Sequence, residues 1–173
     1  LAFGNTHTLG YGSREGARVG SALATGEAVD CDAGVDPAGV DKTLVSAVQR
    51  ILKSPGSGIE LPNVQEIRIF KATADGGETE DKVNVWRYVG EGNGPEVDPG
   101  PGVLYIDFDQ WGGTAWPACE RENGGVTPDS IGVTVTYRYD FVTPLPAMLD
   151  ALTGGALSLE LTETTVMSLN PSV

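Results

Sequence analysis

Three aspartates are the side chains of this chain whose type and spacing could do chemistry. Asp107 and Asp109 lie two positions apart in an apolar run, so on a β-strand they would share one face, and Asp140 could join them. Such a cluster could perform acid–base chemistry or bind Ca²⁺. A solvated strand end is the simpler interpretation, and we favour it. We therefore expect no metal ion and no cofactor, and Asp107 and Asp109 are the residues on which the alternative depends.

A long loop-like stretch follows at residues 111–128, and it contains Trp111 and Trp116. Two neighbouring tryptophans could form a stacking platform for a sugar ring, although anchoring a loop in the core is the more common role of such side chains. Long loops in compact domains are usually functional or tied down. We take Trp111 and Trp116 as the candidate partner-binding loop.

Signatures of the common hydrolases are missing from the sequence. The single histidine, His7, lies in a predicted helix, where we expect a solvated side chain. Neither a Gly-x-Ser-x-Gly nor a His-Glu-x-x-His motif occurs. The net charge of −13 argues against binding of nucleic acid or of anionic lipid surfaces. The sequence thus predicts a protein that is not an enzyme and that does not bind nucleic acid.

The two cysteines, Cys31 and Cys119, are too few and too far apart for a CxxC metal or redox site. Each lies in a stretch containing Gly or Pro that is typical of a loop. We expect one disulfide between Cys31 and Cys119 and an oxidising compartment. Two unrelated free thiols are the alternative.

Residues 1–25 have the periodicity of a helix with an unusual glycine content. Apolar and small residues recur every three or four positions, at Leu9, Gly12, Gly16, Val19, Gly20 and Leu23. Each glycine costs about 1 kcal/mol relative to alanine inside a helix, which is tolerable where a bare backbone allows close packing. We expect the face of Gly12, Gly16 and Gly20 to lie directly against a sheet, with a contact to a neighbouring subunit as the alternative.

The rest of the chain predicts a second helix and an antiparallel sheet. Asp36-Pro37 is a helix start signal, which places the second helix at 36–53. Alternation of apolar side chains over 131–141, and again over 157–169, is typical of strands with one buried face. Further predicted elements are strands at 64–70, 83–89 and 103–108, and a short helix from Thr143 that ends at Gly154-Gly155.

Together these elements predict one α+β domain over residues 1–173. The N-terminal helix (1–25) and the second helix (36–53) should pack on one face of an antiparallel sheet of four or five strands formed by 64–169. The chain does not begin with Met, and its first residues are apolar, so we expect a processed or trimmed product whose first helix continues from an absent segment.

Both ends of the chain resemble the TadE-like family, the minor pseudopilins of tight-adherence (Flp-type) pilus systems. At the N-terminus the resemblance rests on Phe3-Gly4 and on the Arg-Glu-Gly-Ala-Arg run over 14–18. The C-terminal motifs that carry it lie at 133–139, 143–145, 152–155, 157–159 and 164–167. The resemblance covers roughly 1–25 and 127–169 and leaves 26–126 unaligned.

This resemblance implies a pilin-like fold and a non-enzymatic role in pilus assembly or surface adherence. It implies other pilin or pilus-assembly subunits as partners, a membrane anchor through an absent N-terminal helix, and a location at the cell surface or in a pilus. The alternative is an extracellular module that binds glycan or calcium, or an acidic-residue hydrolase, that uses residues 103–120.

Overall fold

The alternating run that begins at Ile131 forms β6 (Ser130–Asp140), on which much of the domain is assembled. It pairs in antiparallel orientation with β1 (Val64–Ala72) on one side and with β7 (Ser158–Ser168) on the other. Ile131 and Val133 are fully buried, because the apolar face of the strand lies beneath a helix. The predicted alternation over 131–141 is therefore confirmed for the described part of that run.

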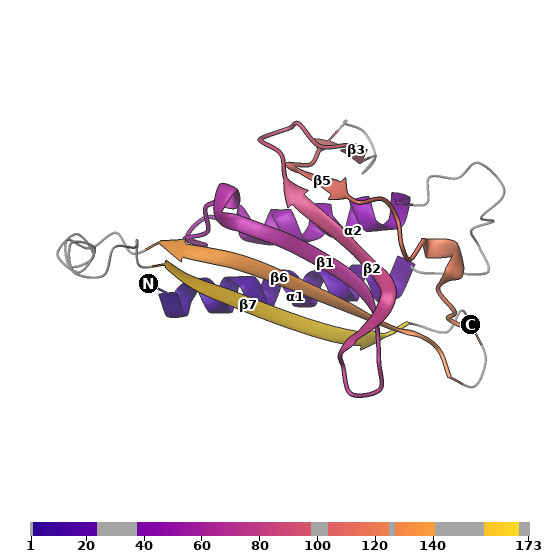
Figure 1. Ribbon diagram of the computed structural model, residues 1–173. Helices are drawn as coiled ribbons and strands as arrows, with labels where there is room; N and C mark the ends of the chain where they lie inside the picture. Colours follow the sequence, from indigo (N-terminus) through magenta and orange to yellow (C-terminus); the bar gives the residue numbers. More distant parts are fainter. Residues whose placement is uncertain (1, 24–37, 98–103, 125–126, 141–157, 170–173) are drawn as a thin grey trace.

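The computed structural model describes residues 2–23, 38–97, 104–124, 127–140 and 158–169. It is the predicted α+β fold, with an antiparallel five-stranded sheet in the order β5-β2-β1-β6-β7 (Figure 1). The remaining strands of this sheet are β2 (Glu78–Tyr88) and β5 (Phe108–Trp111). A separate two-stranded sheet pairs β3 (Glu96–Val97) with β4 (Leu104–Tyr105).

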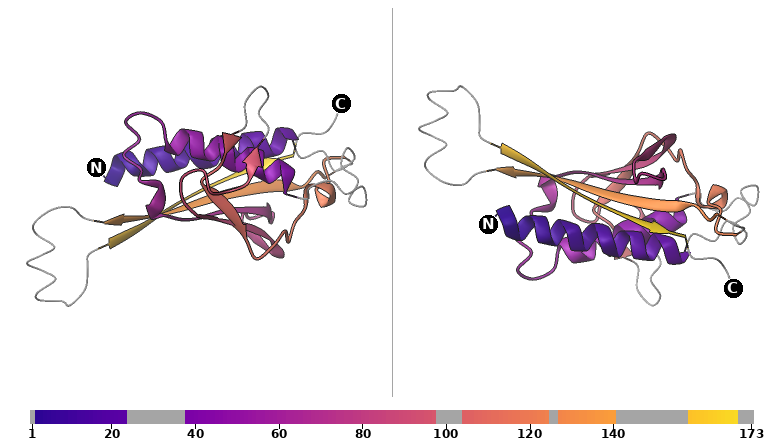
Figure 2. Two further views of the ribbon diagram at one scale, coloured as in Figure 1. Left: turned by 90° about the horizontal axis from the view of Figure 1, so that it is seen from above. Right: turned by 90° about the horizontal axis from the view of Figure 1, so that it is seen from below.

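Both long helices, α1 (Ala2–Leu23) and α2 (Gly39–Leu52), lie on one face of the sheet (Figure 2). Helix α1 packs against α2, β6 and β7, which leaves the opposite face of the sheet uncovered by either helix. The predicted second helix at 36–53 is observed from Gly39, and its expected start at Asp36-Pro37 lies outside the described residues, as does the short helix expected from Thr143.

The glycine face of α1 fits into the corner between α2 and β6. A Cβ added to Gly16 would lie 2.7 Å from Val48 Cγ2 of α2 and 3.3 Å from Val133 Cγ1 of β6, and one added to Gly20 would also meet both elements. At Gly12, by contrast, the three nearest atoms all belong to α2. The expectation of direct contact with the sheet is therefore correct for Gly16 and Gly20 and wrong for Gly12, whose nearest neighbours belong to α2 and not to a strand.

The run 103–108, predicted as one strand, is instead divided between two sheets. Leu104 and Tyr105 form β4, and β5 begins only at Phe108. Asp107 interrupts the run because its backbone N–H donates to the Gln49 side chain of α2 (2.8 Å) instead of to a neighbouring strand. The chain therefore turns inward between β4 and β5.

Candidate interaction surface

One face of the sheet points away from both helices, and we call it the open face. Its identity follows from β6, where Val133 contacts the glycine face of α1 and its neighbour Thr134 must point to the other side. The hydroxyl of Thr134 lies 2.7 Å from that of Thr164 on β7. The open face thus carries a pair of hydroxyl groups where β6 meets β7.

A single row of side chains crosses the open face from one edge of the sheet to the other. Residues paired opposite one another are, in order from β5 to β7, Trp111, Val85, Arg68, Thr134 and Thr164. Because directly opposite residues point to the same side of a sheet, these side chains form one continuous row, which we call the Trp111 row. The row runs from an aromatic ring, through a charge, to hydroxyl groups.

Ion pairs hold the charged part of this face in place. Arg68 donates two hydrogen bonds to Glu78, from Nε (2.7 Å) and Nη2 (2.6 Å), and a third from Nη1 to Glu66 (3.2 Å). The hydrogen bonds with Glu78 are the main reason that the pKa of Arg68 is raised, so the guanidinium stays charged. Arg87 Nη2 lies 3.6 Å from the second oxygen of Glu66, which extends the network toward β5.

Trp111 is the most exposed large apolar side chain of the described residues, at 63% of its full accessible surface. It lies at the end of β5, where pairing with Val85 fixes the backbone. The guanidinium carbon of Arg87 lies 4.8 Å from the centre of its ring, within the range of a cation–π contact. The indole is therefore displayed to solvent in a defined orientation.

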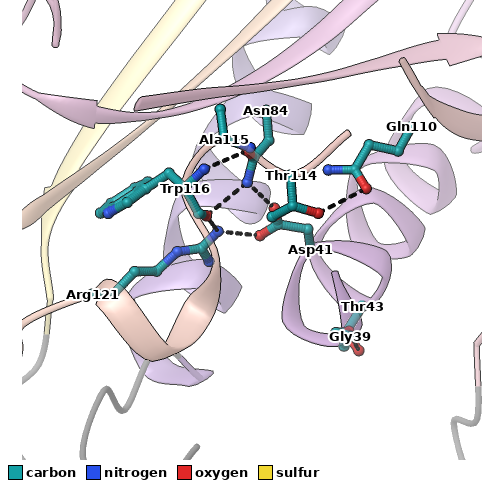
Figure 3. A network of polar contacts seen from close by, with 9 residues as sticks. All are labelled: Gly39, Asp41, Thr43, Asn84, Gln110, Thr114, Ala115, Trp116 and Arg121. Atoms are coloured by element: carbon teal, nitrogen blue, oxygen red, sulfur yellow. Dashed lines mark hydrogen bonds and ion pairs between the residues drawn. The ribbon is translucent and has the colours of Figure 1, made fainter. Parts of the chain in front are cut away.

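Trp116 has the opposite environment: only 1% of its surface is exposed. Its backbone joins a buried polar network around Asn84, in the middle of β2 (Figure 3). The Asn84 amide oxygen accepts hydrogen bonds from Ala115 N and Trp116 N, both at 2.8 Å. Its amide nitrogen donates to Trp116 O (2.8 Å) and to Asp41 of α2 (2.7 Å). All four bonds available to the amide are used.

A buried ion pair completes the network. Arg121 Nη2 donates to Asp41 (2.6 Å) and to Trp116 O (3.0 Å), and its guanidinium carbon lies 4.7 Å from the centre of the Trp116 ring (Figure 3). The side chains of Asp41 and Arg121 are both completely buried. Because a buried charge needs a partner, this pair anchors the loop after β5 to α2 and β2. Trp116 is thus a buried anchor of the loop. Trp111, predicted to belong to the same loop, is instead the last residue of strand β5, where it pairs with Val85 and is exposed.

Sequence reasoning missed Asn84, Asp41 and Arg121. A signal for Asn84 was present, because it shares a strand face with Trp86 and is therefore a polar residue at an apolar position. No comparable signal marks Asp41 or Arg121, which lie 80 positions apart and meet only through the fold.

The aspartates proposed as an alternative metal site are separated by the fold. Asp107 is 2% exposed, precedes β5, and accepts hydrogen bonds from Lys53 Nζ (3.1 Å) and Gly92 N (2.8 Å). Asp109 is exposed within β5, and its carboxylate accepts a hydrogen bond from Gln110 N (2.8 Å). The expectation of a shared strand face is therefore wrong, because Asp107 does not lie in a strand.

The third aspartate, Asp140, is paired with Arg138 at the end of β6 (3.1 Å). In the parts of the chain that the structure describes, no group of three or more His, Cys, Asp or Glu side chains is arranged to hold a metal ion. The hydrogen bond from Lys53 to Asp107 raises the pKa of the lysine, so the described role of Asp107 is that of a buried structural counter-ion.

Cys119 lies in the short 3-10 helix η2 (Ala118–Glu120), two positions before Arg121, and it is not a free thiol. Its predicted partner Cys31 lies outside the described residues, so the Cys31–Cys119 pairing stays a prediction. If it forms, the disulfide would join the same loop that the Asn84 network already anchors.

Comparisons with protein-family models, with curated proteins and with solved structures found no match to this chain. Within the described ranges, neither helix combines the length and the apolar character that crossing a membrane requires. The surface itself offers an oriented indole beside paired charges.

Proposed function

We propose that this chain is the ectodomain of a minor pilin-like protein that acts through assembly or surface adherence and not through catalysis. The observation that carries the proposal is Trp111, a solvent-exposed indole held by Arg87 beside an ion-paired, strand-borne surface. Tryptophan and arginine are the residues most often found at the energetic centre of protein interfaces. The partners would be other pilin or pilus-assembly subunits.

Pre-organisation is the physical reason that this surface suits a partner protein. Ordering a long, mobile side chain at an interface has an entropic cost, and that cost is lower where the side chain is already held. Arg68 is held by Glu78 and Glu66, and Arg87 by Glu66 and the Trp111 ring. Both helices lie on the other face of the sheet, so the open face stays accessible to a partner. A first helix that continues from a membrane anchor and packs along the sheet, as proposed here, would leave this face free.

The arrangement of α1 supports the same proposal. Its glycine face brings the backbone close to α2 and β6, which is the close packing that the N-terminal helix of a pilin-like fold needs. The anchor, the location at the cell surface and the membership of a pilus remain parts of the proposal that rest on the sequence resemblance.

The experiment expresses the full-length protein, with its natural leader, in the source organism and follows its co-purification with sheared surface filaments. Trp111→Ala should abolish this association without lowering the melting temperature. Tyr105→Ala is the matched control, since Tyr105 is an aromatic residue 50% exposed on β4, outside the five-stranded sheet. Retained association of Trp111→Ala would exclude the Trp111 row as the contact, and full-length protein found in the cytoplasm would overturn the assembly role.

Glycan binding is the second candidate, and the exposed Trp111 ring is the observation that favours it. Arg87 lies over the ring, and a sugar could stack on the remaining surface of the indole, with the Asp109 carboxylate nearby in the same strand to accept hydrogen bonds. A glycan array probed with the wild-type domain and with Trp111→Ala separates the two functions. Selective glycan binding that is lost in Trp111→Ala would favour this alternative.

A further inference from the structure

The outer edge of β7 is a regular strand edge that pairs with no other strand in the described part of the chain. All eleven residues from Ser158 to Ser168 pair with β6 without a register shift, so the strand is straight enough to template another. Edge strands are usually protected by proline, by charged side chains such as lysine, by bulges, by very short length or by a covering helix or loop. Strand β7 has no proline, lysine or bulge and is as long as the longest strands of the sheet. Its charged side chains are Glu160 and Glu163, and Glu163 lies on the side that faces α1.

A cleft of about 290 Å³ lies beside this edge, between β7 and α1. Its lining comes from one side of α1 and from one residue of β7: Thr6, His7, Gly10, Tyr11, Arg14 and Glu163. Gly10 leaves room in the lining, because an added Cβ would be 3.7 Å from Glu163 Oε2 and nothing else lies within 4 Å. A hydrogen bond between Ser13 and Thr165 (2.9 Å) holds α1 against the inner face of β7, so the separation of helix and strand is fixed.

The cleft offers two charges of opposite sign that have not neutralised each other. No ion pair joins Arg14 or Glu163 to another residue within the described ranges. The Arg14 guanidinium carbon lies 5.9 Å from the centre of the Tyr11 ring, and 60% of the Tyr11 surface is exposed. The lining can therefore bind a carboxylate at Arg14, a cation at Glu163 and apolar surface at Tyr11.

We propose that β7 and α1 form an acceptor groove for an extended segment of another protein, which adds to the sheet as a further strand. The main chain of the segment would bond to the free edge of β7, and alternate side chains would enter the cleft. One of those side chains is acidic and pairs with Arg14, and another is basic and pairs with Glu163. The cleft lies on the side of β7 that faces α1, whereas the Trp111 row lies on the open face and reaches β7 only at Thr164, so this inference does not depend on the proposed function.

A second copy of this chain is a less suitable occupant. Two antiparallel β7 strands centred on Glu163 would place its carboxylates directly opposite each other, which is destabilising in a sheet. Each copy also has a net charge of −13, so the copies repel one another. A segment with one acidic and one basic groove-facing side chain meets neither obstacle.

The test selects a phage-displayed library of random linear decapeptides on the immobilised full chain. We expect an enriched pattern with an acidic and a basic residue on the same strand face. Arg14→Glu should weaken the selected peptides about tenfold or more, as for loss of a charge-assisted contact. When the same library is selected on the Arg14→Glu variant, the enriched peptides should carry a basic residue at the position that was acidic. Arg18→Glu is the matched control, because Arg18 lies one turn further along α1, outside the cleft, and pairs with Glu15.

A second variant, Gly10→Phe, fills the cleft and should abolish peptide binding while the circular dichroism spectrum stays unchanged. Amide hydrogen exchange should show added protection confined to 158–168 when peptide is bound. The proposal is overturned if saturating selection yields no binders, if binding is indifferent to Arg14→Glu and Gly10→Phe, or if protection appears elsewhere. A concentration-dependent dimer that is lost in the same two variants would make a second copy the occupant and would also overturn it.

Discussion

Arg87 lies over the indole of Trp111, with 4.8 Å between the guanidinium carbon and the centre of the ring, while its Nη2 lies 3.6 Å from Glu66. One arginine thereby connects the only exposed tryptophan of the described residues to the ion pairs of β1. This relationship makes Trp111 a defined surface feature and gives the first prediction.

A double-mutant cycle on Arg87→Ala and Trp111→Ala should give a coupling energy of about 0.5–1 kcal/mol, the magnitude of an exposed cation–π contact. Each single variant should cost little stability, because neither side chain is buried. Urea unfolding of the four proteins measures the coupling. A value indistinguishable from zero would mean that the indole is not held by the arginine.

Breaking the buried ion pair of Asp41 and Arg121 should cost more stability than either surface variant. Asp41→Ala should destabilise the domain by about 3–5 kcal/mol, because it leaves a buried guanidinium without its counter-ion. The double variant Asp41→Leu/Arg121→Met should recover most of that loss, since it removes both charges. Guanidinium chloride denaturation of the three proteins decides this, and a double variant as unstable as Asp41→Ala would show that the Asn84 network needs the carboxylate itself.

The glycine face of α1 should not tolerate larger side chains. Gly16→Leu is expected to cost about 1–3 kcal/mol through over-packing, because even its Cβ would lie 2.7 Å from Val48 Cγ2. Gly4→Ala is the control: nothing lies within 4 Å of its added Cβ. That variant should gain up to about 1 kcal/mol from helix propensity. Thermal unfolding measures both variants, and a melting temperature of Gly16→Leu equal to that of the wild type would contradict the close packing at Gly16.

Lys53 should make stability sensitive to alkaline pH. Its pKa in the folded protein is raised above the ordinary value of 10.5, chiefly by the hydrogen bond to Asp107. Because the folded-state pKa is raised, the stability that the charged Lys53 contributes is fully present below pH 10.5. This stability is lost as the pH rises through the folded-state pKa. Lys53→Met should remove this alkaline component and cost about 1–3 kcal/mol at neutral pH, because the buried Asp107 carboxylate loses a donor. Identical alkaline profiles for wild type and Lys53→Met would refute the assignment.

The disulfide between Cys31 and Cys119 is the fifth prediction. In the chain-entropy model a bridge that closes so long a loop contributes about 4–5 kcal/mol. Mass spectrometry of the unreduced protein after alkylation should therefore find no modified thiol. Two alkylated cysteines would show that the loop is held by the Asn84 network alone.

Much of the fold could be predicted because its signals are local. The three-to-four-residue spacing along α1 and the alternation along β6 and β7 depend only on helix and strand geometry, so they identify each element and its buried face. The predicted single strand at 103–108 failed because a contact from Gln49 to Asp107, 58 positions away, competes with strand pairing there.

The sequence by itself determined the two helices, the main strands of the α+β sheet and the acidic character of the surface, since periodicity and charge are properties of neighbouring residues. Only the tertiary structure decided which of two similar tryptophans is displayed. Trp116 is buried because Asn84, 32 positions earlier in the chain, bonds its backbone, and because Arg121, itself held by Asp41, lies over its ring. Trp111 stays outside because its strand register points it to the face that no helix covers. Such contacts join residues distant in sequence, and no local pattern encodes them.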